Sequence, residues 1–220
     1  MKCVILALLL CLPSYSCVAA NATASDKVNL TIQGDLAAGK IKSEDNRCQE
    51  CHGPDGNGQG PATGAAGKFA KLAGQSPDYM LKQIREFRTG ERKHDLMSIM
   101  AKSIDDSDAA DIAAYFASQT KMQGDGSGGN PSAEAMFNLG DANRNIVACV
   151  SCHGIKGKGI DTPHQLIPVI GGQEWHYLEK QLLDWRSGER KNSAGAVMNS
   201  ITKQLTNDEI RLLTDYISGL

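Results

Sequence analysis

The apolar residues of this chain recur with the spacing of amphipathic helices, and the same apolar stripe occurs twice. In the first half, Met80, Ile84 and Phe87 are three or four residues apart, which predicts a helix with one apolar face. Ser76 and Pro77 precede this stripe and are typical of an N-cap and a first helical residue. The equivalent stripe of the second half consists of Leu178, Leu182 and Trp185.

A second pair of matched helices is predicted at the end of each half. Asp105 is the expected N-cap of a helix that reaches about Ser118, and Thr206 with Glu209 has the spacing of a capping box. The residues expected to face inward are Ile112, Tyr115, Phe116, Ile210, Leu213, Tyr216 and Ile217. Shorter helices are expected at 35–45 and 132–143. No segment shows the period-two alternation of a strand, so the predicted fold class is all-α.

Short sequence repeats indicate that the two halves arose by internal duplication. The tetrapeptide LAGQ at 72–75 corresponds to IGGQ at 170–173, and RTGERK at 88–93 corresponds to RSGERK at 186–191. Both pairs are offset by 98 residues (170 − 72 and 186 − 88). A fixed offset over several separate segments predicts one structural unit that is present twice.

The repeat also defines the expected domain organisation. A Gly-rich stretch at 122–131 has the composition of a flexible linker, and it separates domains expected at 34–121 and 132–220. Residues 1–22 have the charged start, short apolar run and small-residue end of a cleavable secretory signal peptide. Residues 23–33 form a leader without clear periodicity.

The N-terminal segment predicts an exported, periplasmic protein. Its apolar run is too short for a transmembrane helix, which disfavours an uncleaved membrane anchor. A lipid anchor on Cys17 is disfavoured too, because the bulky Tyr15 lies where such a signal has small residues. Cleavage of the signal would remove Cys17 together with Cys3 and Cys11.

The four remaining cysteines lie in two copies of the motif Cys-x-x-Cys-His, which are 101 residues apart (149 − 48). The copies contain Cys48, Cys51 and His52 in the first half and Cys149, Cys152 and His153 in the second. Thiols three residues apart lie on one helix face, where each can form a thioether to haem, and the next histidine can bind the iron. A single copy would also suit a zinc or thiol-redox site. Two copies within one repeat predict two covalently bound haem c groups.

The repeat selects a methionine as the second axial ligand in each half. Met97 lies 45 residues after His52 (97 − 52), and Met198 lies 45 residues after His153 (198 − 153). The offset between Met97 and Met198 is again 101 residues (198 − 97), although the repeated segments between motif and methionine are offset by only 98. We therefore predict histidine and methionine coordination of both irons.

Other candidate ligands lack a counterpart in the second copy. Met100 is the alternative in the first half, but Ile201 occupies the matching position, so we interpret position 100 as a core position. His94, His164 and His176 have no histidine at their repeat positions and are interpreted as surface or supporting residues.

Composition adds two constraints. With 23 basic and 25 acidic residues the net charge is −2, which gives no indication of a nucleic-acid partner. Aromatic residues make up only 5%, so a large apolar cofactor in each half would help to complete two small cores.

The loops after the motifs differ in charge, with Asp55 in the first and Lys156 and Lys158 in the second. This difference is either ordinary loop charge or a means of steering different partners.

With these motifs, the chain from about residue 34 onward resembles two-haem cytochromes of the cytochrome c4 family, a duplication of class I cytochrome c. The resemblance implies two class I domains related by a pseudo-twofold axis, each wrapped round one haem, with propionate edges near the interface. It also implies a periplasmic one-electron carrier, often peripheral to the membrane, that delivers electrons toward a terminal oxidase. The family tends to have proline before its Leu-x-Gly-Gln element; Pro168 fits, whereas the first half has Ala70.

The predicted coordination favours an electron-transfer protein over an enzyme. Histidine and methionine on each iron leave no site for a small-molecule substrate, so the expected partners are redox proteins. One alternative is a haem subunit that accepts electrons from a dehydrogenase, as in flavocytochromes. A two-haem peroxidase is less favoured because it needs an open iron.

Overall fold

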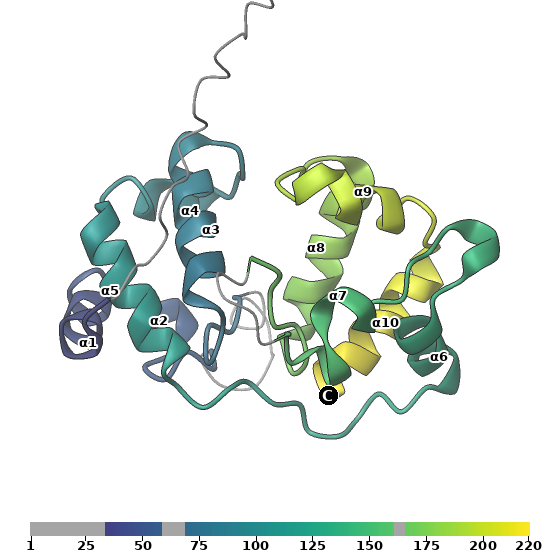
Figure 1. Cartoon of the computed structure of the whole chain (residues 1–220). Coiled ribbons are helices and arrows are strands. Elements are labelled where there is room, and N and C mark those ends of the chain that lie inside the picture. The colour runs from purple at the N-terminus through teal and green to yellow at the C-terminus, as the bar shows by residue number, and fades with distance from the viewer. Residues whose placement is uncertain (1–33, 59–68, 161–165) are drawn as a thin grey trace, which may run out of the picture.

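The computed structural model describes residues 34–58, 69–160 and 166–220 (Figure 1). The predicted signal peptide, the leader and parts of both loops after the Cys-x-x-Cys-His motifs lie outside these residues. Within them the structure is helical, and the only strand-like pairing is an isolated bridge between Asp141 and Ile146. The predicted all-α class is confirmed.

The described residues of the first half form five helices, and the caps predicted for two of them, Ser76 and Asp105, are present. The Asp35 carboxylate accepts from two main-chain N–H groups of the first helix, Ser76 caps the middle helix, and Asp105 caps the last. Gly90 ends the middle helix with a φ of 84°. The helices are α1 (Leu36–Asp45), α2 (Gln49–His52), α3 (Pro77–Thr89), α4 (Asp95–Met100) and α5 (Asp106–Ala117).

The second half repeats this plan with additional short turns. The helix expected at 132–143 ends earlier, because Gly140 leaves the helical conformation (φ 67°, ψ −156°) and Asp141 caps a separate 3-10 turn. The predicted capping box of Thr206 and Glu209 is present. The elements are α6 (Pro131–Leu139), η2 (Ala142–Arg144), α7 (Val150–His153), η3 (Ile155–Gly157), α8 (Trp175–Ser187), η4 (Ala194–Ala196), α9 (Val197–Thr202) and α10 (Asn207–Gly219).

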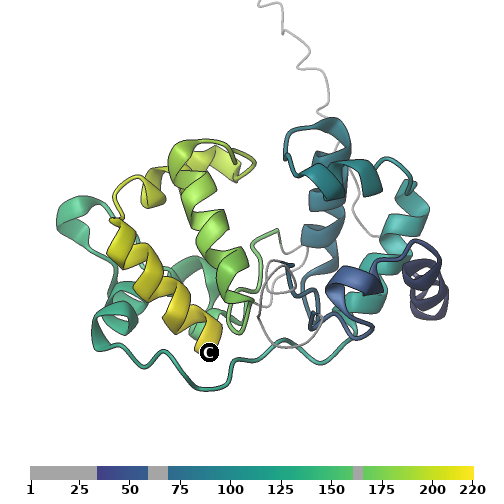
Figure 2. The same cartoon turned by 180° about the vertical axis from the view of Figure 1, so that it is seen from behind.

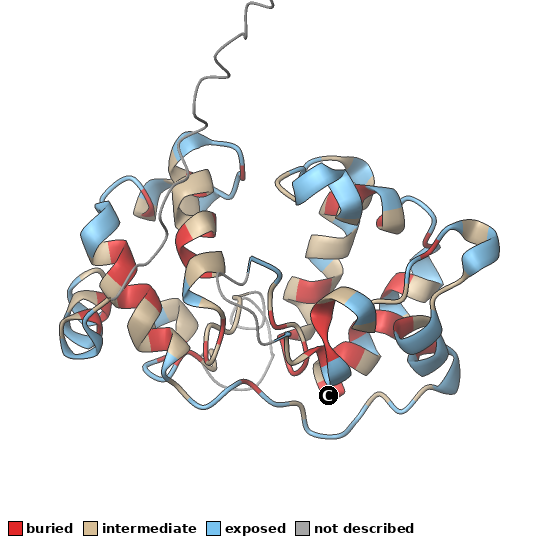
Figure 3. Ribbon diagram, in the orientation of Figure 1, coloured by how far each residue is buried: buried red, intermediate tan, exposed pale blue. Residues whose placement is uncertain are grey.

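Each half has its own hydrophobic core, as the separate groups of buried residues in Figure 3 show. Burial of each large apolar side chain contributes about 1.5–3 kcal/mol. Tyr115 and Tyr216, both expected to face inward, lie partly buried at the edges of these cores. The core residues are Met80, Leu81, Ile104, Ala109, Ile112, Ala113 and Phe116 in the first half, and Phe137, Ile146, Leu178, Leu205, Ile210, Leu213 and Ile217 in the second.

The two halves pack side by side, with α3 and α8 on their facing sides (Figures 1 and 2). Gln75 donates to the main-chain oxygen of Val169 (2.9 Å) and accepts from its N–H (2.9 Å). Gln173 makes the same pair of bonds with Lys71, at 2.9 and 2.7 Å. Because Gln173 and Val169 each follow their counterparts by 98 residues (173 − 75 and 169 − 71), these reciprocal bonds express the predicted pseudo-twofold relation.

The Gly-rich segment between the halves is packed against the protein, unlike the flexible linker expected from its composition. Met122 is fully buried and donates its N–H to the main-chain oxygen of Ala73 (3.1 Å). Gly124 donates to the main-chain oxygen of Leu220 (2.6 Å). A Cβ on Gly124 would lie 2.2 Å from the main-chain carbon of Gly219, so glycine is needed here for close backbone approach.

Lys158 fastens this segment to the second domain. Its ammonium group donates to the main-chain oxygens of Met122 (2.8 Å), Gly171 (3.0 Å) and Leu220 (3.1 Å). All three of its hydrogens are therefore used within the protein. Of the two lysines considered for steering, Lys156 is exposed, whereas Lys158 has a structural role.

Candidate haem sites and the cavity between the halves

Each Cys-x-x-Cys-His motif forms one isolated helical turn. Cys48 and Cys149 are the N-caps of α2 and α7, so the second cysteine and the histidine follow within the same turn. Gly154, directly after the second motif, has a φ of 77°, and a Cβ there would lie 2.1 Å from the main-chain oxygen of Gly159. The glycine lets the following loop fold back on the motif, where Gly159 donates to the main-chain oxygen of His153 (2.8 Å).

Both motif histidines are oriented by a backbone carbonyl. Nδ1 of His52 lies 2.7 Å from the main-chain oxygen of Ala70, and Nδ1 of His153 lies 2.9 Å from that of Pro168. A carbonyl can only accept, so Nδ1 carries the proton and Nε2 is left to bind a metal. Ala70 thus supplies the same carbonyl as Pro168. Burial lowers the pKa of both imidazoles, which keeps them in the neutral, ligating form.

All four motif cysteines are partly buried. Burial raises the pKa of Cys48 and of Cys149 to about 11, so both are protonated at neutral pH. Thiol-redox and metal-binding cysteines have lowered pKa values instead. Within 34–58, 69–160 and 166–220, no group of three or more His, Cys, Asp or Glu side chains could hold a metal ion. The raised pKa of the Cys48 and Cys149 thiols is unlike the lowered pKa of a thiol-redox pair.

Both motifs open onto one cavity of about 1810 Å³ between the halves. Pockets for single small molecules have volumes of about 300–1,000 Å³, so this cavity has room for two large cofactors. Its walls include side chains of both hydrophobic cores, such as Phe116 and Leu213. All eight predicted site residues line it: Cys48, Cys51, His52, Met97, Cys149, Cys152, His153 and Met198. The donor set and the apolar walls therefore fit covalently attached haem.

The two predicted methionine ligands lie on short helices and are partly exposed. Met97 is in α4, which is capped by His94, whose Nδ1 accepts from the main-chain N–H of Met97 (3.3 Å). Met198 is in α9, and its N–H donates to the hydroxyl of Ser193 (3.3 Å). Met100 also lines the cavity and lies outside the buried core, so the structure does not support its interpretation as a core residue.

The remaining two histidines have other positions. His176 lies beside Glu174, with Nδ1 2.8 Å from a carboxylate oxygen, and has a supporting role at the start of α8. His164 lies outside the described residues.

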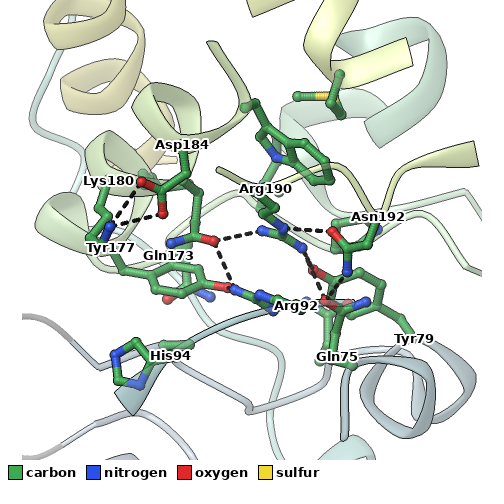
Figure 4. Close-up of a pocket in the computed structure, with 18 of the residues that line it drawn as sticks. Gln75, Tyr79, Arg92, His94, Gln173, Tyr177, Lys180, Asp184, Arg190 and Asn192 are labelled. Atoms are coloured by element: carbon green, nitrogen blue, oxygen red, sulfur yellow. Dashed lines mark hydrogen bonds and ion pairs between the residues drawn. The ribbon is translucent and has the colours of Figure 1, made fainter. Parts of the chain in front are cut away.

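Sequence reasoning missed a polar cluster at the boundary of the halves (Figure 4). Arg92 lies over the ring of Phe87 in its own half, 4.5 Å from the ring centroid, and donates to the hydroxyl of Tyr177 in the other half (3.0 Å). Arg190 lies over Trp185 at 4.3 Å and donates to the hydroxyl of Tyr79 (3.0 Å). The repeated hexapeptides at 88–93 and 186–191 contain both arginines and were the signal that could have identified them.

Two helical domains, each with a Cys-x-x-Cys-His turn on a shared cavity, define a c-type cytochrome with a duplicated domain. The cytochrome c family model matches residues 36–120 and 144–220. Cytochrome c4 of Pseudomonas aeruginosa is 41% identical over 190 residues, which cover 85% of this chain and 89% of that protein. The chain therefore belongs to the cytochrome c family, in the group of the cytochromes c4, which are electron-transfer proteins.

Two further comparisons support this assignment. The crystal structure of reduced recombinant cytochrome c4 from Pseudomonas stutzeri matches with a TM-score of 0.74 and 36% identity, and the match covers 85% of this chain and 99% of that one. A thiosulfate dehydrogenase electron acceptor of Stutzerimonas stutzeri is 32% identical over 177 residues, covering 79% of this chain and 78% of that protein. The predicted fold and class, an electron carrier and not an enzyme, are confirmed.

Proposed function

We propose that this cytochrome carries one haem in each domain and transfers single electrons between protein partners in the periplasm. The first haem would be attached to Cys48 and Cys51, and the second to Cys149 and Cys152. The observation that carries this proposal is the matched orientation of His52 and His153 by backbone carbonyls beside one shared cavity. The proposed domains are 34–121 and 132–220, with 1–22 as the export signal.

The residues of this chain would attach and orient each haem. They would also occupy both axial positions of its iron, so that no substrate can bind there. When bound, each haem iron supplies reversible one-electron chemistry. The histidine Nε2 of each motif is held ready for one axial position, and Met97 and Met198 are proposed for the other. Methionine and histidine ligation raises the reduction potential, which favours delivery to an oxidising acceptor such as a terminal oxidase.

A second candidate role is that of the electron acceptor of a dehydrogenase. The similarity to a protein named thiosulfate dehydrogenase electron acceptor favours it specifically. Both roles use the same haem sites, but the first is defined by the acceptor of the electrons and the second by their donor. Any membrane association is proposed to be peripheral, as the family resemblance implies. No helix among the described residues is long and apolar enough to cross a bilayer.

A spectroelectrochemical titration of the purified holoprotein tests the proposal. We expect two c-type haems per chain by pyridine haemochrome assay, low-spin spectra in both oxidation states, and two reversible one-electron waves. One haem per chain, or a high-spin iron that turns over peroxide, would contradict it. Reduction by a thiosulfate dehydrogenase and oxidation by a terminal oxidase, each measured by stopped-flow, then distinguish the two roles.

A further inference from the structure

His94 forms three hydrogen bonds with the first turn of α4, the helix that carries Met97. Its Nδ1 accepts from the main-chain N–H of Met97 (3.3 Å), and its main-chain oxygen accepts from that of Ser98 (2.8 Å). The N–H of His94 donates to the hydroxyl of Ser98 (3.2 Å). N–H groups in the first turn of a helix have no acceptor within the helix, so His94 supplies one to the residue that is predicted to bind the iron.

The rest of the protein does little to fix α4 by packing. None of its residues, all of which the structure describes, is buried. The imidazole of His94 lies edge-on to the ring of Phe87, with centroids 6.4 Å apart and planes at 70°, an arrangement that aromatic pairs favour. Phe87 belongs to the buried face of α3. His94 therefore connects an exposed short helix to a firmly packed part of the first half.

The hydrogen bond also fixes the role of the His94 ring within the cavity that it lines (Figure 4). Nδ1 accepts a hydrogen bond, so the ring hydrogen is on Nε2. The motif histidines His52 and His153 have the opposite arrangement, with the hydrogen on Nδ1 and Nε2 left to bind a metal. In this state His94 supports Met97 and does not compete with it as an iron ligand.

The second half makes the same bond with a different residue. The main-chain N–H of Met198 donates to the hydroxyl of Ser193 (3.3 Å). The repeat position of His94 (94 + 98) is instead Asn192, whose amide bonds to Glu86 of the other half (2.5 Å). Histidine is also not among the residues preferred at N-caps. A side-chain acceptor for the methionine N–H is therefore common to both halves, although the residue that supplies it is not.

We infer that His94 is a positioning residue that holds Met97 in place to bind the iron of the first haem. The inference rests on the proposed haem attachment and on the proposed role of Met97 as the axial ligand. The side chain of Met97 extends from the main-chain segment that His94 holds. Loss of the bond would loosen this segment, and the thioether would be displaced from the iron more easily.

Competition by imidazole, a small external ligand for oxidised haem iron, tests the inference in the holoprotein. His94→Ala should bind imidazole at one haem about fivefold more tightly than the wild-type protein, since a lost helix cap corresponds to about 1 kcal/mol. His94→Asn restores a side-chain acceptor that N-caps favour, so it should bind imidazole as weakly as the wild-type protein. Both variants lack the ring and the charge, and their difference isolates the hydrogen bond.

Two further variants locate the effect. Ser103→Ala removes a hydrogen bond to the main-chain oxygen of Met100 (2.8 Å) at the opposite end of α4, and should leave imidazole binding unchanged. Met97→Ala removes the proposed ligand itself, so it should open the same iron and identify the haem concerned. Optical titration of the oxidised proteins with imidazole measures all four variants.

Equal imidazole affinities of His94→Ala and the wild-type protein would overturn the inference. An equal gain in Ser103→Ala, or a His94→Asn variant that behaves like His94→Ala, would overturn it too. If His94→Ala fails to fold, hydrogen exchange of the wild-type holoprotein decides the question: we expect protection of the Met97 main-chain N–H, and exchange at the rate of an unprotected amide would contradict the inference. Unchanged imidazole binding in Met97→Ala would instead show that the proposed ligand is wrong, and the inference would fall with it.

Discussion

The two halves of this cytochrome hold the motif histidine in the same way but hold the predicted methionine ligand differently. Met97 lies five residues after Arg92 (97 − 92), whereas Met198 lies eight residues after Arg190 (198 − 190). The longer segment of the second half contains Gly195 and Ala196 with positive φ angles of 60° and 53°. The bonds of Gln75 and Gln173 and those between Arg92, Arg190 and the tyrosines are thus duplicated across the interface, whereas the segments that present the methionines differ.

The longer segment is fastened by a residue that the first half lacks. Asn199 is buried and donates to the main-chain oxygens of Trp185 (2.6 Å) and Arg190 (2.9 Å). The matching position in the first half (199 − 101) is Ser98, which only accepts a bond from the N–H of His94 (3.2 Å). The second methionine is therefore tied to the arginine turn, and the first is not. The two haem sites should consequently differ in how firmly their methionine is held.

Removal of the predicted methionine ligands tests the difference between the two haem sites most directly. Met198→Ala and Met97→Ala should each lower one reduction potential strongly and remove about half of the thioether-to-iron charge-transfer band of the oxidised protein. Met100→Ala should leave the band intact, although Met100 also lines the cavity. Optical spectra of the three oxidised variants provide the measurement. Full retention of the band in Met198→Ala would refute that ligand, and loss in Met100→Ala would transfer the role from Met97.

Replacement of Asn199 by serine, which occupies the matching position 98 in the first half, tests whether Asn199 is what holds the second methionine segment more firmly. The change leaves two buried carbonyls without a donor and should lower the free energy of unfolding by about 2–3 kcal/mol. The charge-transfer band of the second haem should also weaken at a lower temperature. Denaturant titration and temperature-dependent spectra measure both effects. Ser98→Ala is the matched control, and an equally large loss there would show that the two segments are held alike.

Lys158 is a second asymmetric feature, with Asn57 at the matching position (158 − 101) of the first half. Lys158→Met removes the donor from three main-chain oxygens and should cost about 1–2 kcal/mol of unfolding free energy. Denaturant titration of the holoprotein checks this value. Lys156→Glu, which reverses an exposed charge, should instead alter only the ionic-strength dependence of electron transfer. Unchanged stability in Lys158→Met would show that the linker is held by other contacts.

The parts of the site that depend on local chemistry could be predicted from the sequence. The motif residues, the helix caps at Ser76, Asp105 and Thr206, and the two apolar stripes all follow from spacings of a few residues. The end of α6 was missed because Gly140 stops the helix while Asp141 starts a new turn, two opposite signals at adjacent positions.

The interface could not be predicted in the same way. Gln75 and Gln173 were recognised as a repeat, but their partners lie 94 and 102 residues away in the chain. The arginine cluster likewise joins side chains from opposite halves, and no local spacing records which residues meet across a pseudo-twofold axis. The repeat therefore indicated that these residues matter without indicating their contacts.

The smallest expected effect concerns Ala70, which stands where the second half has Pro168. Because the carbonyl at this position already binds His52 at 2.7 Å, Ala70→Pro should preserve the histidine orientation and change the potential of the first haem only slightly. Proline reduces the freedom of the unfolded chain, so the free energy of unfolding should rise by about 0.4–1 kcal/mol. Denaturant titration and spectroelectrochemistry measure the two quantities. A large shift in potential would show that backbone rigidity at this position, and not the carbonyl alone, sets the properties of the iron site.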